Sequence, residues 1–154
     1  MPTLDLAPFV EELRADIGRT WPPEYIDVER GAIAKFARSY GETNPLYFDE
    51  DYARTTRFGG IIAPPTYISC FGTEAFYGAI SGHPELKRKL HGSDVIEFSA
   101  PIRPGDRIAI TLRLVDVYSK DGRNGTMLFE VFEQQMVNQH GQEVARLQMT
   151  TVSL

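Results

Sequence analysis

Apolar and polar residues alternate along the last part of the chain, and this period of two limits the possible folds more than any other feature. The alternation is clearest at residues 108–114, 127–132 and 145–149. Successive side chains of a strand point to opposite faces of its sheet, so each run predicts a strand with one buried face. Turn-forming residues separate the runs, at residues 103–106, 120–125 and 138–141. From His91 onward we therefore expect a meander of four long antiparallel strands.

The stretch from Pro65 to Ile80 is apolar on nearly all sides, with Glu74 as its single charged residue. A helix that is hydrophobic all round is one that other elements surround. A proline suits the first turn of a helix, because the N–H group that it lacks would have no partner there. The sequence thus predicts an α+β domain in which an antiparallel sheet wraps around a long buried helix. Cys70 lies in this stretch, and we expect a buried, unreactive side chain.

The first part of the chain predicts one strand and two helices. Apolar residues recur at helical spacing over residues 1–17, and Gly18 ends this amphipathic helix, which either caps the domain or forms a dimer contact. A short strand follows at residues 25–28, with Asp27 as the expected N-cap of a helix from Glu29 to Tyr40. A chain of 154 residues fits one core. We expect a single domain over residues 1–154, with the N-terminal helix at 1–20 and the core at 21–154.

Two neighbouring segments predict an active-site loop. Residues 41–49 have the sequence Gly-Glu-Thr-Asn-Pro-Leu-Tyr-Phe-Asp, and residues 59–67 have the sequence Gly-Gly-Ile-Ile-Ala-Pro-Pro-Thr-Tyr. Gly41 suits a left-handed end of the preceding helix, and Asn44 followed by Pro45 cannot extend that helix. Glu42 is therefore held just beyond a helix end. The polar residues 49–60 between the two segments are expected to be mobile.

The sequence Gly-Glu-Thr-Asn-Pro-Leu-Tyr at residues 41–47 is similar to the signature of MaoC-like (R)-specific hydratases and dehydratases. In that signature an acidic residue two positions before Asn-Pro and a His two positions after the proline form the catalytic dyad. Here the acidic position holds Glu42 and the His position holds Tyr47. The resemblance therefore implies a dyad that lacks its His.

Five phrases resemble one subfamily more closely, the N-terminal MaoC-like dehydratase domain. They are Val-Glu-Arg-Gly at 28–31, Asn-Pro-Leu-Tyr-Phe-Asp at 44–49, Ile-Ala-Pro-Pro-Thr at 62–66, Leu-His-Gly at 90–92 and Arg-Pro-Gly-Asp at 103–106. The resemblance runs from about Pro23 to the last residue and implies the hot-dog fold. It also implies a non-catalytic hot-dog unit that pairs edge to edge, either as a homodimer or as a heterodimer with a dyad-bearing partner.

The missing His matters because hydration of an enoyl thioester needs a base that activates water, an acid for the alpha carbon and donors for the thioester oxygen. The family's acidic residue and His share the first two tasks, and N–H groups at the start of the buried helix can perform the third. Glu42 could still act as a base. Tyrosine, with an ordinary pKa of about 10, cannot replace His near neutral pH.

By this resemblance Glu42 and Tyr47 occupy the degenerate dyad positions. The residues expected to bind substrate are Asn44, Ala63, Pro64, Thr66 and His91. For Asn44, a role in forming the turn is favoured over a role in donating a hydrogen bond to the ligand. His91 is expected either near the tunnel or the dimer seam, or in a purely structural role.

The composition excludes several other function classes. The net charge is −5 and the basic residues are scattered, which argues against nucleic acid, because phosphate contacts need clustered positive charge. One cysteine permits no intrachain disulfide, and no His, Asp and Glu residues have metal-ligand spacing. No glycine-rich phosphate loop follows a strand, so no cofactor is expected. Without a signal peptide or an apolar run approaching ~18 residues, we expect a cytoplasmic protein that does not enter the membrane.

Three functions stay open from the sequence. The first is the substrate-binding half of an enoyl-CoA or 3-hydroxyacyl-CoA hydratase/dehydratase, active with a catalytic partner. The second is a self-sufficient (R)-specific enoyl-CoA hydratase that uses a variant dyad. The third is a non-enzymatic acyl-CoA-binding module. In each case the expected ligand is a thioester of CoA or of an acyl carrier protein.

Overall fold

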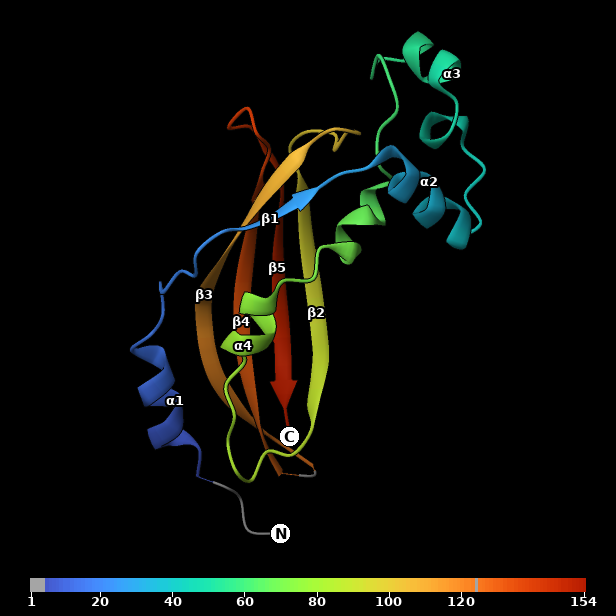
Figure 1. Ribbon diagram of the computed structural model, residues 1–154. Coiled ribbons are helices and arrows are strands. Elements are labelled where there is room, and N and C mark those ends of the chain that lie inside the picture. Colours follow the sequence, from blue (N-terminus) through green and yellow to red (C-terminus); the bar gives the residue numbers. More distant parts are fainter. Residues whose placement is uncertain (1–4, 124) are drawn as a thin grey trace.

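The fold is built on one antiparallel sheet (Figure 1). The structure is a computed structural model that describes residues 5–123 and 125–154. The strands are β1 (Glu24–Asp27), β2 (Lys89–Phe98), β3 (Arg107–Gly122), β4 (Gly125–Val137) and β5 (Glu143–Ser153). Their order across the sheet is β1-β3-β4-β5-β2, and each neighbouring pair is antiparallel. The antiparallel sheet that the alternation predicts is therefore confirmed.

The predicted four-strand meander is wrong in one respect. β3, β4 and β5 are successive neighbours, but β2 lies at the far edge of the sheet, beside β5. Residues 99–106, which join β2 to β3, include Pro101 and Pro104. Proline lacks the N–H group that a tight hairpin uses, and this segment crosses past β5 and β4 to reach β3 near the opposite edge of the sheet. As a result β2 pairs with one strand, and its other edge has no partner among the described residues.

The main core lies on one face of the sheet, here called the inner face. Alternate side chains of the long strands are buried on it, and Ile108, Ile110 and Phe132 are at most 1% exposed. Leu6 and Val10 of the first helix pack against one part of this face, and Tyr67, Ile68 and Phe71 pack against another. The period-two pattern thus identified the buried side of each strand correctly.

Short helices cover the inner face and one end of the sheet. They are α1 (Ala7–Arg14), α2 (Arg30–Ser39), α3 (Glu50–Thr55) and α4 (Glu74–Ala79), with the 3-10 segments η1 (Pro45–Tyr47) and η2 (Pro65–Cys70). The first helix is shorter than predicted, and residues 1–4 lie outside the described residues. The helix at 29–40 is confirmed, but Asp27 does not cap it. Asp27 is still part of β1, where it lies 3.9 Å from Arg107.

The long buried helix predicted from Pro65 to Ile80 is wrong. The stretch forms η2, an extended break and then α4, none of whose residues is buried. Gly72 and Thr73 form the break, because the Thr73 hydroxyl accepts a hydrogen bond from the Phe76 N–H at 3.3 Å and starts a new helix. Cys70, at the end of η2, is exposed rather than buried. The apolar composition indicated contact with the sheet, but it did not establish one continuous helix.

α4 is held at both ends by side chains of other elements. At its start, the Glu24 carboxylate of β1 accepts hydrogen bonds from the N–H groups of Glu74 and Ala75, at 3.1 and 2.8 Å. Just after its end, the Ser81 N–H donates to the buried Glu130 carboxylate of β4 at 2.9 Å. The helix lies over the sheet (Figure 1), and these carboxylates fix its two ends.

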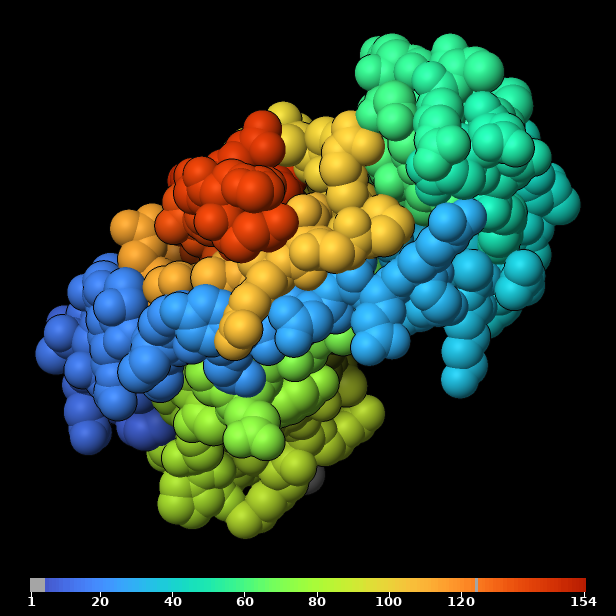
Figure 2. All heavy atoms as spheres, turned by 45° about the horizontal axis from the view of Figure 1, so that its top comes forward, coloured from blue at the N-terminus to red at the C-terminus, as the bar shows by residue number. Residues whose placement is uncertain are grey.

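Residues 30–60, which contain α2, η1 and α3, form a lobe beside one end of the sheet. The lobe projects from the rest of the molecule in Figure 2. Ile33 of α2 packs into the main core, and a separate cluster made by Leu46, Ala53, Ile61 and Ile62 stabilises the lobe itself. None of the helices in the described part of the chain has both the length and the hydrophobicity needed to cross a membrane.

Candidate functional site

The turn after α2 has the conformation that its sequence predicts. Gly41 has a φ of +72°, in the left-handed region. The N–H groups of Gly41 and Glu42 donate to the carbonyl oxygens of Arg38 and Ala37, each at 3.0 Å. Because these bonds complete the end of the helix, the backbone fixes the position of Glu42, whose side chain is exposed.

Asn44 stabilises the next turn. Its side-chain oxygen accepts a hydrogen bond from the Leu46 N–H at 3.0 Å, and Leu46 is buried in the lobe. Pro45 and the two residues after it, the last of which is Tyr47, then form η1. Asn44 is therefore a structural residue in this structure, with its side chain committed to the turn.

Tyr47 and Glu42 are electrostatically coupled. Burial, and after it the negative charge of Glu42, raises the pKa of the Tyr47 hydroxyl above its ordinary value. A hydroxyl that keeps its proton at neutral pH can donate a hydrogen bond, but it cannot serve as a general base. Glu42 and Tyr47 are therefore close enough for their charges to interact, and the Tyr47 hydroxyl is protonated at neutral pH.

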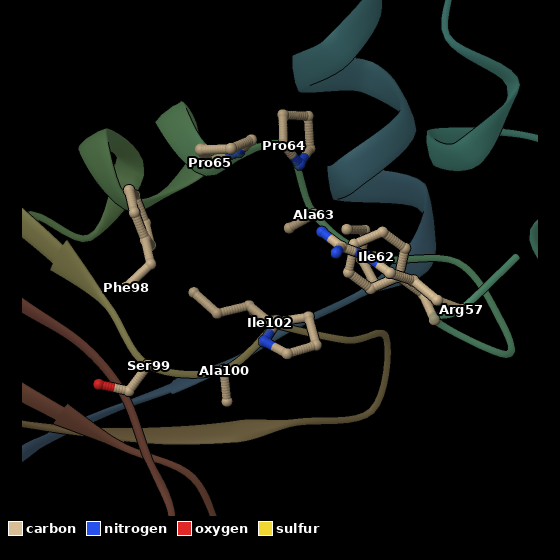
Figure 3. Close-up of a pocket in the computed structure, with 11 residues that line it drawn as sticks. Arg57, Ile62, Ala63, Pro64, Pro65, Phe98, Ser99, Ala100 and Ile102 are labelled. Atoms are coloured by element: carbon tan, nitrogen blue, oxygen red, sulfur yellow. The ribbon is translucent and has the colours of Figure 1, made fainter.

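An open cavity of about 370 Å³ adjoins the lobe, and we call it the entrance pocket (Figure 3). Its walls come from three segments, residues 57–58, 62–65 and 98–102. Ala63 and Pro64, both predicted to bind substrate, line it, and the Ala63 N–H donates to the Ile102 carbonyl at 2.8 Å. Tyr47 packs in the same apolar cluster as Phe58 and Ile62, so Tyr47 adjoins the wall of this pocket.

Two arginines lie at the lobe side of the entrance pocket. The Arg57 guanidinium lies over the Phe58 ring, 4.8 Å from its centre, and lines the pocket. Arg103 donates from Nη2 to the Phe58 carbonyl at 2.7 Å. Sequence reasoning missed Arg57 and Phe98 as pocket residues, although it predicted Ala63 and Pro64, which line the same pocket. An apolar cavity with cationic side chains beside it suits a ligand that combines a hydrocarbon chain with phosphate groups.

A second cavity, of about 220 Å³, lies further along η2, and we call it the inner pocket. It is enclosed by the segment 68–77, by β2 and by the inner faces of β4 and β5. His91 lines it, with Nε2 3.3 Å from Oδ2 of Asp94. Thr66, in contrast, is exposed and lines neither pocket. The residues predicted to bind substrate are therefore divided between the turn, the two pockets and the surface.

Comparison with known proteins identifies the family. The family described as FAS1-like, dehydratase domain region, matches residues 15–147. The chain belongs to this family. The FAS1-like dehydratase region here is also similar to the UPF0336 protein of Streptomyces avermitilis, at 31% identity over 113 residues, 70% of this chain and 75% of the relative. The corresponding protein of Streptomyces griseus is 34% identical over 113 residues, with the same coverage. The MaoC-like resemblance stated from the sequence is confirmed.

Solved structures share this fold. A chain of the ChsH1–ChsH2 complex from Mycobacterium tuberculosis superposes with a TM-score of 0.77 at 20% identity, over 97% of this chain and 96% of that chain. The HadBC (3R-hydroxyacyl-ACP dehydratase) complex from the same organism gives 0.72 at 19%, over 88% and 96%. The MaoC-like dehydratase from Rhodospirillum rubrum gives 0.67 at 23%, over 90% and 92%. At these identities the likeness shows the fold alone, and the hot-dog prediction holds for the sheet but not for a long helix.

Proposed function

We propose that this chain is the substrate-binding subunit of an enoyl-thioester hydratase/dehydratase and works with a partner that carries the dyad. One observation carries the proposal. The entrance pocket adjoins Tyr47, the residue at the His position of the resembled dyad, and burial and the charge of Glu42 raise the pKa of its hydroxyl. The chain keeps a cavity for the thioester while lacking the group that would transfer protons at neutral pH.

The chemistry of the pocket supports an acyl-thioester ligand. Its lining is largely aliphatic and aromatic, which suits an acyl or pantetheine chain. Arg57 and Arg103, beside the pocket, can bind the phosphates of CoA or of a carrier prosthetic group. Neither role requires a cofactor or a metal ion.

The edge of β2 supports a partner subunit. All ten residues of β2 are exposed, including Val95 at 58% and Phe98 at 50%, and the strand pairs only with β5 among the described residues. A long, unpaired edge strand with exposed apolar side chains is a template for pairing with another chain. Phe98 also lines the entrance pocket, so a strand added to β2 would lie next to that pocket. The HadBC and ChsH1–ChsH2 structures are likewise described as complexes.

The first test is activity of the chain alone. We expect the purified chain to bind crotonyl-CoA in calorimetry and to show little hydration of it, and Tyr47→Phe to change neither result. Robust hydration by the lone chain, lost on Glu42→Ala, would overturn the proposal.

The second test is the partner. When the chain is purified from its native lysate, a second hot-dog protein should co-purify with it, and the sequence of that protein should contain the acidic residue and the His of the dyad. Val95→Lys should remove that protein, because a charge blocks edge pairing, whereas Tyr52→Lys on exposed α3 should retain it. Capture of a protein without the dyad would argue against a hydratase pair and for a binding module.

A self-sufficient hydratase is the second candidate, and the proximity of Glu42 and Tyr47 favours it. In that case Glu42 would be the base, and the Tyr47 hydroxyl would donate a proton or bind the thioester oxygen. Tyr47→Phe distinguishes the two functions, because it should abolish activity in a working enzyme and have no effect in a binding subunit.

A further inference from the structure

The phrase Leu-His-Gly at 90–92 encodes a β-bulge. His91 pairs with Thr151 and Ser93 pairs with Thr150, so Gly92 is an extra residue with no partner of its own in the register. A Cβ atom at Gly92 would lie 2.8 Å from the backbone oxygen of Thr150, closer than such atoms approach. Only glycine fits here without a shift of the backbone. Bulges of this kind occur next to functional sites, where they redirect side chains.

The bulge places His91 and Asp94 on the same face of β2. Residues three apart in a regular strand point to opposite faces, but the extra residue Gly92 between His91 and Asp94 brings these two side chains to the same face. His91 lies opposite Thr151 and Asp94 lies opposite Met149, and both of these β5 side chains are buried on the inner face. His91 and Asp94 therefore face the inner pocket together, with Nε2 of His91 3.3 Å from Oδ2 of Asp94.

A second polar group lies on the opposite wall of the inner pocket. Gln134 of β4 is only 2% exposed, and its amide donates to the Thr73 hydroxyl at 3.2 Å. This is the one side-chain hydrogen bond of Gln134 in the part of the chain that the structure describes. The rest of the amide lines the cavity, where the other walls are mostly apolar. A buried amide that is only partly bonded favours a ligand that completes its hydrogen bonds.

The inner pocket lies beyond the entrance pocket along the same two elements. The entrance pocket lies between Pro64 or Pro65, at the start of η2, and Phe98, at the end of β2. The inner pocket lies between Ile68, further along η2, and Asp94. The two pockets share no lining residue, so an acyl chain that enters beside Phe98 would have to follow η2 to place its distal part in the inner pocket. At ~30 Å³ for each water-sized group, the 220 Å³ cavity holds about seven such groups.

We propose that the inner pocket selects acyl chains that carry a neutral oxygen, a hydroxyl or a ketone, in their distal part. This inference rests on the proposed function, because it assumes that the ligand is an acyl thioester. Gln134 offers both a donor and an acceptor to such an oxygen, and His91 offers a third polar atom. The Asp94 carboxylate disfavours a chain that ends in a carboxylate, because like charges repel. A plain alkyl chain would leave the buried amide unpaired, and that loss supplies the discrimination.

The test compares octanoyl-CoA with octanoyl-CoA analogues that carry a hydroxyl near the middle or at the end of the chain. Calorimetry on the complete chain should give about tenfold tighter binding for one of the hydroxylated analogues, the effect of one or two hydrogen bonds. Gln134→Leu should bring the two affinities to within about twofold of each other. The matched control is Gln135→Leu, which changes the exposed neighbour on the opposite face and should preserve the preference.

The outcomes separate the two proposals. If every acyl-CoA binds with equal affinity, or if Gln134→Leu folds and keeps the preference, the inner-pocket proposal is wrong and the proposed function stands. If no acyl-CoA binds, the proposed function itself fails. Should Gln134→Leu not fold, His91→Leu on the exposed strand β2 replaces it, and it should weaken the preference by about threefold to tenfold.

Discussion

Replacing Gly92 by alanine tests whether the bulge in β2 is as constrained as its geometry indicates. The added methyl group would lie 2.8 Å from the backbone oxygen of Thr150 and 3.1 Å from Cγ2 of Val152. The oxygen belongs to β5, which is paired with β4 on one side and β2 on the other. Because β5 cannot move without disturbing both ladders, we expect β2 to shift at the bulge instead.

Overpacking of this kind costs about 1–3 kcal/mol. The smaller conformational entropy of the unfolded alanine chain offsets about 0.4–1 kcal/mol of that cost. A net loss of about 1–2 kcal/mol lowers the Tm of a domain of this size by about 2–8 °C. Thermal unfolding followed by circular dichroism measures the change, and urea unfolding at a fixed temperature gives the free energy independently.

Gly78→Ala provides the control. Gly78 lies in α4, and no neighbouring heavy atom is within 4 Å of a Cβ added there. Alanine in a helix is favoured over glycine by about 0.5–1 kcal/mol, so this variant should be slightly more stable than the natural chain. If Gly92→Ala unfolds at the same temperature as Gly78→Ala or above it, the close approach at the bulge is not a real constraint, and the argument that the bulge orients His91 and Asp94 fails.

Three further predictions follow from the core and the turn. Phe132→Ala removes a fully buried ring that packs edge-on against Phe76, and it should lower the free energy of unfolding by about 3–5 kcal/mol in urea titrations; a loss below about 1 kcal/mol would contradict the assigned core. Burial raises the pKa of Glu130 above its ordinary value of 4.5. Between these two pKa values the folded chain still holds the Glu130 proton, whereas the unfolded chain has released it. The free energy of unfolding therefore falls as the pH rises from 4.5 through the raised pKa. Glu130→Gln should therefore exceed the natural chain in Tm at neutral pH and lose this advantage near pH 4.5; a constant difference would refute the assignment. Glu42→Asp combined with Tyr47→His restores the residue types of the dyad and should give more crotonyl-CoA hydration than either single change. If the double variant folds and binds CoA but gains no activity, positions 42 and 47 do not correspond to the family's dyad or the loop lacks the catalytic geometry.

The sheet could be predicted from the sequence because a strand's period is local. Each alternating run identifies its own buried face, and Ile108, Ile110 and Leu112 are buried as their spacing predicts. The order of the strands is not a local property, so the position of β2 beside β5 had no signal in its own residues. The break in the apolar stretch also depends on distant groups. Thr73 could be read as a cap, but the Glu24 carboxylate that completes the helix start comes from β1, about fifty residues away.

In the candidate site, too, the features that depend on nearby residues could be predicted from the sequence, and those that depend on distant residues could not. The turn at Gly41 and Asn44 depends on the conformational preferences of those two residues, and both have the predicted structure. Arg57 and Phe98 meet at the entrance pocket only because the fold brings the lobe to the end of β2. In a regular strand, residues three apart such as His91 and Asp94 would point to opposite faces. The Gly92 bulge reverses that conclusion, and its cause is the contact with Thr150 of another strand.

The way α4 is held has a consequence for the kinetics of the molecule. The helix has no buried residue of its own, and its ends depend on the carboxylates of Glu24 and Glu130. Segments with few buried contacts open independently of the rest of a domain, at a free energy below that of global unfolding. In hydrogen exchange we expect the amides of residues 74–79 to exchange well before those of β4, with which the helix is in contact. Phe76 and Tyr77 of α4 line the inner pocket, so each such opening would briefly remove one wall of that cavity and give a chain already seated there a second way out, besides the path through the entrance pocket.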